Sequence, residues 1–208
     1  MGHDCGKHGY KHKKLICRIF IGFLIFQIAV LFIVFLVWAI LRPTKPSFTI
    51  QDATVYAFNV STSPCLLTST IQLTITSRNP NSKIGVYYDN LHVYATYRDQ
   101  QITLPTRLPS EYQGHKEISV WSPFVFGNLV PVAPHNAMAL AQDQISQMVD
   151  LVIKLDCRVR FKVGSFISGR YHLDVRCPAR ITFGSRSTGV LVGGGVKYQL
   201  VQGCSVSL

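Results

Sequence analysis

An uninterrupted apolar run near the N-terminus constrains this chain more than any other feature. Residues 19–41 carry no charged side chain, and Gln27 is their only strongly polar member. A helix rises about 1.5 Å per residue, so the run would be about 34 Å long and could cross a hydrocarbon core of about 30 Å. It is too long for the apolar part of a cleavable signal peptide, and Trp38 suits the membrane interface. We therefore expect a transmembrane helix over residues 19–41.

Basic residues are distributed unequally on the two sides of this run. Only Arg42 and Lys45 lie close on the C-terminal side. The N-terminal side has a single acid, Asp4, and five basic residues: Lys7, Lys11, Lys13, Lys14 and Arg18. Because positive charge resists translocation, residues 1–18 are predicted to be a basic cytosolic tail. The chain after the helix is then lumenal or extracellular, where Asn59, in the sequon Asn-Val-Ser, is a candidate for glycosylation.

The pattern of the chain changes after the apolar run. Residues 42–47 contain Pro43 and Pro46 and are predicted to be a short stiff linker. From residue 48 onward apolar and polar residues alternate, as in Ile71, Leu73 and Ile75, which indicates strands with one buried face. Strands are expected near 48–57 and at 67–76, 84–97, 101–108, 114–126, 151–163, 171–183 and 196–201.

One segment departs from the alternation. Residues 134–149 place apolar side chains at mostly helical spacing after Pro134, which suits a first helical turn, so one helix is expected there. Residues 185–195 are rich in Gly and Ser and predict a loop. Seven or eight strands with one helix predict a mainly β fold, in which residues 48–208 form an antiparallel β-sandwich after the single N-terminal helix.

Several segments resemble a known family. The run from Asn79 to Asp89, Asn-Pro-Asn-Ser-Lys-Ile-Gly-Val-Tyr-Tyr-Asp, resembles the first motif of the plant NHL family, the non-race-specific disease-resistance and harpin-induced-like proteins. Further matches are Tyr112-Gln-Gly-His-Lys116, Phe161-Lys-Val-Gly164, Ser168-Gly-Arg-Tyr-His172 and Cys204-Ser-Val206, with Phe161 where Trp is common. The resemblance implies a late-embryogenesis-abundant group 2 β-sandwich outside the plasma membrane, with roles in pathogen defence, the hypersensitive response and abiotic stress. It implies no catalytic residues.

The residues of the first motif have a structural interpretation and a binding one. Asn79, Pro80 and Asn81 suit a rigid turn, and Gly85 permits a bulge or a close backbone approach as the next strand begins. Tyr87 and Tyr88 should point to opposite faces of that strand, one into the core and one toward a partner. Asp89 closes the motif. Folding explains every part of it, so the structural interpretation is favoured.

Four cysteines lie on the predicted oxidising side and can pair in three ways: Cys65, Cys157, Cys177 and Cys204. If residue 163 lies opposite residue 171 in a hairpin, Cys157 faces Cys177. The family resemblance instead implies that Cys177 pairs with Cys204, and we prefer this second pairing. Cys17, beside the apolar run, and Cys5 are candidates for lipidation.

Cations gather on two of the predicted strands. The net charge is +11, and residues 43–208 hold 15 Lys and Arg against nine Asp and Glu. Alternation places Arg158, Arg160 and Lys162 on the outer face of one strand, with Arg176 on its expected neighbour and Arg170 nearby. This basic face would suit acidic cell-wall polymers or anionic lipid headgroups. A solvated face with cross-strand pairing to Asp174 is the alternative. Nucleic acid is not an expected partner outside the cytosol.

Motifs for catalysis are missing from the sequence. The chain has no Gly-x-Ser-x-Gly, no His-Glu-x-x-His and no Walker loop. We therefore expect a non-enzymatic membrane-anchored interaction protein without a metal or cofactor. Its expected partners are the lipid bilayer, related membrane proteins in homo- or hetero-oligomers, and acidic polymers. A structural tether between membrane and cell wall, or at membrane contact sites, is the alternative.

Overall fold

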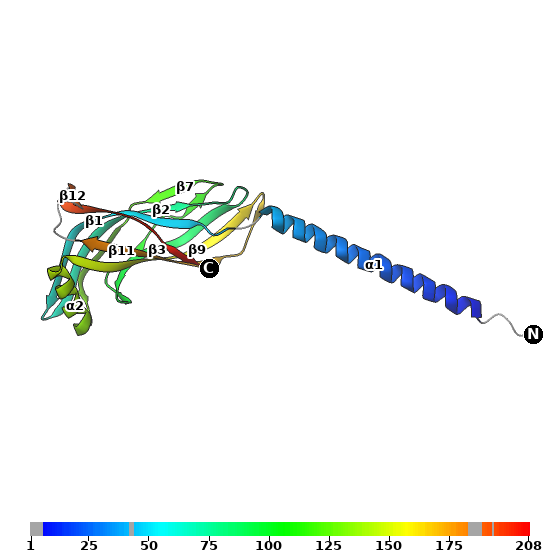
Figure 1. The fold of residues 1–208 in the computed structure, drawn as a ribbon, viewed down its shortest axis with the longest axis horizontal. Helices are drawn as coiled ribbons and strands as arrows, with labels where there is room; N and C mark the ends of the chain where they lie inside the picture. The colour runs from blue at the N-terminus through cyan, green and yellow to red at the C-terminus, as the bar shows by residue number, and fades with distance from the viewer. Residues whose placement is uncertain (1–5, 42–43, 183–188, 193) are drawn as a thin grey trace, which may run out of the picture. The chain divides into compact units, whose positions relative to one another are not determined.

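The computed structural model describes residues 6–41, 44–182, 189–192 and 194–208. The chain divides into two compact units, residues 1–43 and residues 44–208. The first is the helix α1 (Gly6–Leu41), and the second contains all the strands and a second helix (Figure 1). The fold is therefore mainly β, as the alternation of the sequence predicts.

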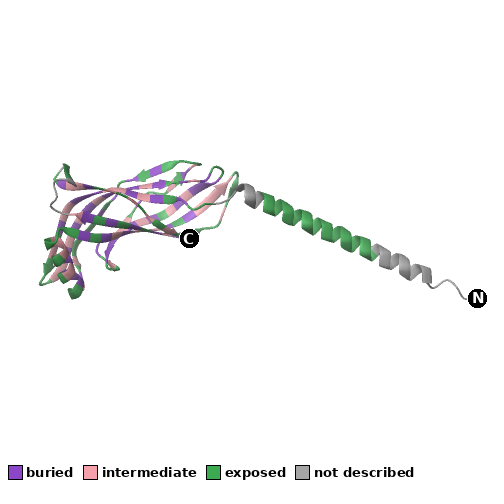
Figure 2. Ribbon diagram, in the orientation of Figure 1, coloured by how far each residue is buried: buried purple, intermediate pink, exposed green. Residues whose placement is uncertain are grey.

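Helix α1 is longer than the apolar run that predicts it. It has 36 residues and begins at Gly6, so the basic segment assigned to a tail continues the same helix. Residues 16–36 have a mean hydropathy of 3.0, and none of them is buried (Figure 2). By length and composition this stretch is able to cross a membrane.

The first sheet of the sandwich contains six antiparallel strands: β1 (Ser47–Thr62), β2 (Cys65–Arg78), β7 (Ile118–Trp121), β8 (Phe124–Pro131), β12 (Gly189–Val192) and β13 (Gly195–Gly203). Their order is β12-β13-β1-β2, and β7 and β8 both pair with the far side of β2. The segment expected as one strand at 114–126 is thus broken between β7 and β8. Pro123 lies at the break, where its carbonyl accepts a hydrogen bond from the Leu73 amide.

The second sheet contains eight antiparallel strands: β3 (Gly85–Tyr97), β4 (Gln100–Gln101), β5 (Thr106–Arg107), β6 (Glu111–Gln113), β9 (Met148–Val163), β10 (Phe166–Ile167), β11 (Tyr171–Thr182) and β14 (Ser205–Ser207). The order is β14-β11-β9-β3-β4. The short strands β5 and β6 also pair with β3, and β10 pairs with β9. The structure therefore confirms the antiparallel sandwich.

Apolar side chains from both sheets form one core between them (Figure 2). On β2 every second residue from Leu67 to Ser77 is buried. Helix α2 (Pro134–Ile145) contributes Ala137 and Leu140 to this core. The helix ends four residues before the expected 149, because Gln147 takes a positive φ of 60° and β9 begins at Met148.

Two other sequence predictions need correction. Residues 189–192, expected in a loop, form the edge strand β12, whereas residues 185–188 and 193 of that loop lie outside the described residues. Tyr171 lies opposite Val159 rather than residue 163. A tight turn after Val163 lets Phe166 pair back onto it, so the hairpin continues through β10. Cys157 consequently faces Leu173 and not Cys177.

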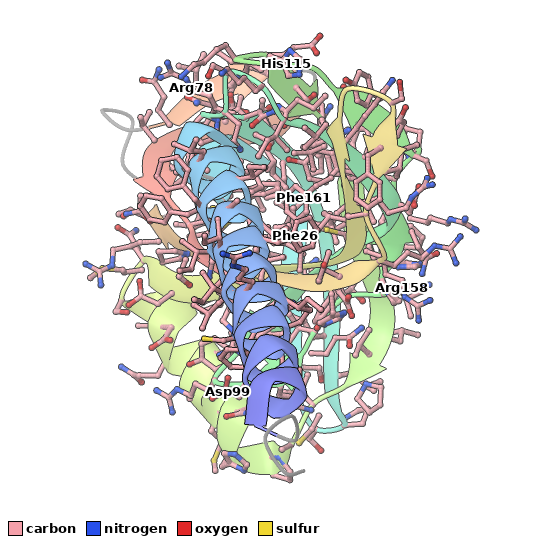
Figure 3. The ribbon with its side chains drawn as sticks, turned by 90° about the vertical axis from the view of Figure 1, so that its right-hand side faces the viewer. Phe26, Arg78, Asp99, His115, Arg158 and Phe161 are labelled. Atoms are coloured by element: carbon pink, nitrogen blue, oxygen red, sulfur yellow. A yellow bond between two sulfur atoms is a disulfide. The ribbon has the colours of Figure 1, made fainter. Side chains whose placement is uncertain are left out.

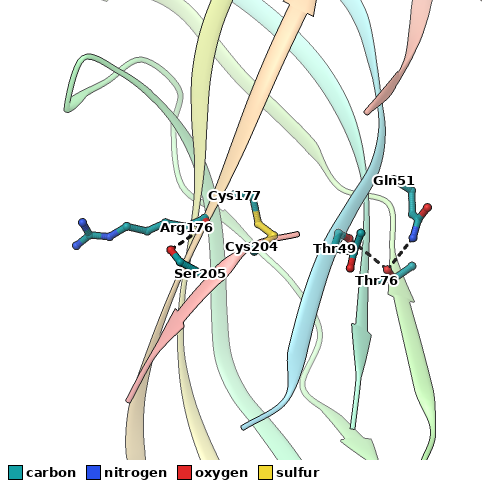
Figure 4. Close-up of a disulfide and its surroundings, with 7 residues drawn as sticks. All are labelled: Thr49, Gln51, Thr76, Arg176, Cys177, Cys204 and Ser205. Atoms are coloured by element: carbon teal, nitrogen blue, oxygen red, sulfur yellow. Dashed lines mark hydrogen bonds between the residues drawn. A yellow bond between two sulfur atoms is a disulfide. The ribbon is translucent and has the colours of Figure 1, made fainter. Parts of the chain in front are cut away.

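A disulfide and hydrogen bonds hold the first and last segments of the β-sandwich in place. Near the C-terminus the chain leaves β13 in the first sheet and crosses to β14 in the second. Cys204 lies at this crossing and forms a disulfide with Cys177 of β11, the pairing that the family resemblance implies (Figure 4). The Cys204 amide also donates to the carbonyl of Phe48. The disulfide therefore connects the two sheets at the point where the chain changes from one to the other.

The N-terminal end of the sandwich chain is held by a side-chain amide. Asn81 Nδ2 donates to the Thr44 carbonyl at 2.7 Å, and Asn81 Oδ1 accepts from the Thr44 amide at 2.9 Å and from its hydroxyl at 2.8 Å. Asn81 is buried. One side chain thus satisfies both backbone polar groups of the residue at which the domain begins.

Replacing Cys204 by Ser should lower the free energy of unfolding by about 3 to 4 kcal/mol, because a bridge across 27 residues restricts the unfolded chain. Urea unfolding of the full chain in detergent, without reductant, measures this. Cys65→Ser is the control, since its side chain can still donate to the Thr62 carbonyl. Equal unfolding midpoints for the Cys204→Ser chain and the parent would show that the bridge does not stabilise the domain.

Replacing Asn81 by Ala should free Thr44 from the sandwich and cost about 1 to 3 kcal/mol of stability, because three part-buried hydrogen bonds to Thr44 are lost. Amide exchange at Thr44 should accelerate at least about tenfold, which mass spectrometry of exchanged peptides detects. Ser82→Ala is the matched control, because Ser82 is exposed in the same turn. Unchanged exchange at Thr44 in the Asn81→Ala chain would contradict the role given to this amide.

Candidate functional site

The Asn-Pro-Asn turn is built around the buried side chain of Asn79. Its Nδ2 donates to the carbonyls of Ile84 at 2.7 Å and Gly114 at 2.9 Å, and its Oδ1 accepts from the Asn81 amide at 3.0 Å. Lys116 reinforces this connection, because its amide donates to the carbonyl of Asn81. The two sequence motifs at 79–89 and 112–116 are therefore one structural unit, although more than twenty residues separate them.

Tyr88 joins the two sheets from inside the core. Its ring packs edge-on against Phe48 and Trp121 of the first sheet, with centroids 6.0 and 5.5 Å away. Its hydroxyl lies 2.9 Å from Ser77 Oγ and donates to Gln113 Oε1 at 2.9 Å. Burial raises the pKa of the Tyr88 phenol. Tyr88 is thus the core member of the tyrosine pair, and its role is structural.

Tyr87 lies on the opposite, outer face of β3, beside Tyr112 of β6. The two ring centroids are 4.5 Å apart. The ring of Tyr112 lies over Gly85, so closely that a Cβ atom at this position would overlap the phenol. Gly85 is therefore needed for a close approach, one of the two roles its sequence context suggests.

A cationic side chain lies over each of these two rings. The guanidinium of Arg160 lies 5.1 Å from the centroid of Tyr87, and the ammonium of Lys162 lies 5.4 Å from that of Tyr112. We call these four residues the tyrosine–cation row. Arg160 also binds Asp89 through two hydrogen bonds of 2.6 and 3.1 Å, and these bonds raise the pKa of the guanidinium. The last residue of the first motif therefore holds one cation of the row in place.

Carboxylates neutralise much of the predicted basic face. Besides Arg160 with Asp89, the ion pairs are Arg176–Asp174 at 2.9 Å, Arg180–Asp150 at 2.6 Å, Lys154–Asp99 at 3.7 Å and, when the histidine is protonated, His172–Asp156 at 3.3 Å. Among the described residues, Arg158, Lys162 and Arg170 have no carboxylate partner. Arg170 is exposed, and so is Arg158 (Figure 3). Positive charge thus remains at the end of β9 and in the segment before β11.

The other candidate residues lie apart from this row. Asn59 is exposed on β1, at a shallow groove that Pro64, Leu66 and Leu129 help to line. Cys157 is a buried free thiol, and burial raises its pKa to about 12. Cys65 is a half-buried free thiol. Cys17 is exposed on α1, and Cys5 lies outside the described residues.

The chemistry of the row is that of binding. Tyrosine faces stack on planar or apolar surfaces, and a lysine or arginine beside them attracts a carboxylate or phosphate. Within the described part of the chain, no three His, Cys, Asp or Glu side chains come close enough to hold a metal ion.

Sequence reasoning did not select Tyr112 as a site residue. Its position two residues before Gly114 in the second motif was the available signal.

Comparison with known proteins finds one matching family model and several similar chains. The profile of the family described as "Late embryogenesis abundant protein" matches residues 74–177. Three Arabidopsis thaliana proteins are similar over most of their length. NDR1/HIN1-like protein 1 is 56% identical, with 99% of each chain covered, and NDR1/HIN1-like protein 12 is 58% identical, with 99% of this chain and 98% of that protein covered. NDR1/HIN1-like protein 26 is 40% identical, with 88% and 87% covered. These matches confirm the resemblance of the motifs, and the chain belongs to the NDR1/HIN1-like family of late embryogenesis abundant proteins.

Proposed function

We propose that this chain is a single-pass membrane protein of the plant defence and stress response, which displays its β-sandwich outside the plasma membrane and acts by binding. The observation that carries the proposal is the apolar surface of α1 over residues 16–36, where no side chain is buried. Such a surface is stable in a bilayer and unfavourable in water. Family membership supports the role in defence and stress.

The distribution of charge supports the proposed orientation. Five basic residues within residues 1–18 precede the uncharged run at 19–41, which favours a cytosolic N-terminus. Asn59 of the sequon is exposed on a strand, so a glycan attached there would not have to enter the interior of the protein. The disulfide between Cys177 and Cys204 suits an oxidising compartment.

An acidic polymer is the proposed binding partner of the second sheet's outer face. Arg158 and Lys162 lie four residues apart on β9, which places them about 13 Å apart along the strand. Between them Arg160 is neutralised by Asp89, and the rings of Tyr87 and Tyr112 lie alongside. Two separate cations on one strand, one of them against an aromatic ring, fit a chain of sugar acids, which presents repeated carboxylates beside the apolar faces of its rings. Such contacts would also let the protein tether the membrane to a cell wall, the second function considered.

The orientation predicts a glycan on Asn59. In plant cells, glycosidase treatment should increase the mobility of the parent chain and leave Asn59→Gln and Ser61→Ala chains unchanged. A Ser61→Thr chain preserves the sequon and should behave as the parent does. In sealed microsomes, added protease should spare the β-sandwich. Digestion of the β-sandwich without detergent would contradict the proposed orientation.

The polymer contact predicts loss of binding when the unpaired cations are removed. Polygalacturonate should bind the full chain in detergent, and the Arg158→Gln, Lys162→Gln double variant should bind at least about tenfold more weakly. The matched control is Arg176→Gln with Arg180→Gln, which removes the same charge from residues already paired with Asp174 and Asp150. Equal weakening of the two variants would mean that net charge alone attracts the polymer.

A further inference from the structure

The domain begins at one end of the β-sandwich, where the strands β1, β2, β3 and β9 also begin or end. Thr44 is bound by Asn81 there, Ser47 of β1 pairs with Arg78 of β2, and Gly85 of β3 pairs with Lys162 of β9. The turn between β9 and β10 closes at the same end, since Val163 pairs with Phe166. We call this region the Thr44 end.

Exposed cations without carboxylate partners gather at the Thr44 end. Lys45, Arg78 and Lys83 are exposed, and none of them has an ion pair among the described residues. Lys116 and Lys162 add two further charges. Glu117 is a nearby acid, and its carboxylate accepts a hydrogen bond of 2.5 Å from the Gly114 amide. Positive charge therefore predominates at this end of the domain.

An apolar hairpin tip lies at the same end of the sandwich as these cations. Phe166 is 71% exposed and Ile167 is 42% exposed, although both side chains are large and apolar. Ile167 lies opposite Lys162 in the pairing of β10 with β9. An exposed aromatic and aliphatic pair beside lysines is the composition of surfaces that enter the headgroup region of anionic membranes.

The length of chain between α1 and the domain strengthens this argument. Only residues 42 and 43 separate Leu41, the last residue of α1, from Thr44, which the side chain of Asn81 holds. Three steps of about 3.8 Å each allow a reach of about 11 Å. If α1 spans a bilayer, this tether gives the Thr44 end a high effective concentration at the membrane surface, so weak contacts suffice.

We propose that the Thr44 end docks onto the surface of an anionic bilayer, with Phe166 and Ile167 inserted at the level of the headgroups and Lys45, Arg78 and Lys83 facing lipid phosphates. The proposal rests on the membrane anchoring proposed above. The Thr44 end shares Lys162 with the proposed polymer-binding face but does not include Arg158, and its docking adds a second membrane contact to that of the helix. Docking would hold the sandwich against the bilayer and direct its other end away from it.

A tryptophan at position 166 provides the measurement. The full chain with Phe166→Trp is placed in nanodiscs whose lipids carry brominated acyl chains, either of phosphatidylcholine alone or mixed with phosphatidylglycerol. The same chain without the substitution supplies the background of Trp38 and Trp121. Docking predicts strong quenching of the added tryptophan in the anionic discs, weak quenching in the neutral discs, and loss of the difference at high salt.

Two triple variants with the same loss of charge test the cations. Lys45→Gln, Arg78→Gln and Lys83→Gln together should weaken docking on the order of 100-fold, because each cation near an anionic surface contributes a factor of about five. The control is Arg98→Gln, Arg107→Gln and Arg180→Gln, which should keep the quenching. All six residues are exposed, so neither variant disturbs the core.

The outcomes separate this proposal from the anchoring on which it rests. Failure of the chain to enter any nanodisc would overturn the anchoring itself. Incorporation with equal quenching in neutral and anionic discs, or with equal loss in both triple variants, would overturn docking and leave the anchoring intact. Binding of polygalacturonate to chains in neutral discs, abolished by the first triple variant, would assign the cations to a polymer and would also overturn docking.

Discussion

The apolar surface of α1 is the constraint on which the proposed placement of the molecule at a membrane depends. Most residues between Ile16 and Leu36 are large and apolar, and none of them is buried by the protein. Burying one such side chain is worth about 1.5 to 3 kcal/mol, so the whole surface amounts to tens of kcal/mol. No contact within the described chain supplies this energy. A bilayer would supply it, and this is the physical basis of the anchoring proposed above.

The family motif fixes the start of the β-sandwich. Asn79 organises the turn through backbone carbonyls, and Asn81 uses its amide to hold Thr44. The same segment then continues into β3, where Tyr88 enters the core and Tyr87 supports the outer row. One stretch of eleven residues thus fixes the start of the domain, connects the two sheets and positions the rings of the candidate binding surface. The buried amides of the motif fix the turn that leads into β3, and they thereby position the half-buried ring of Tyr87.

Local pattern was sufficient to predict most of the architecture. The uncharged run predicts α1, and the alternation of Ile71, Leu73 and Ile75 predicts a strand with one buried face. The features that sequence could not supply depend on long-range geometry. Arg160 and Asp89 are 71 residues apart, and their ion pair removes a charge from the face that alternation makes basic. The register of β9 with β11 depends on a tight turn after Val163, which a Gly-containing loop does not specify. The approach of Tyr112 to Gly85 is likewise visible only once β6 pairs with β3.

Extraction of membranes with alkaline carbonate tests the central claim most directly, because it removes peripheral proteins and leaves spanning ones. Membranes from cells that express the full chain are washed with carbonate at high pH, or solubilised with detergent, and then sedimented. Integration through α1 predicts that the chain stays in the carbonate pellet and is released by detergent. A matched chain in which four of the apolar residues of the span, Phe23, Phe26, Leu31 and Val34, are changed to Lys should be released by carbonate. Release of the parent chain by carbonate alone would contradict the claim that α1 spans the bilayer.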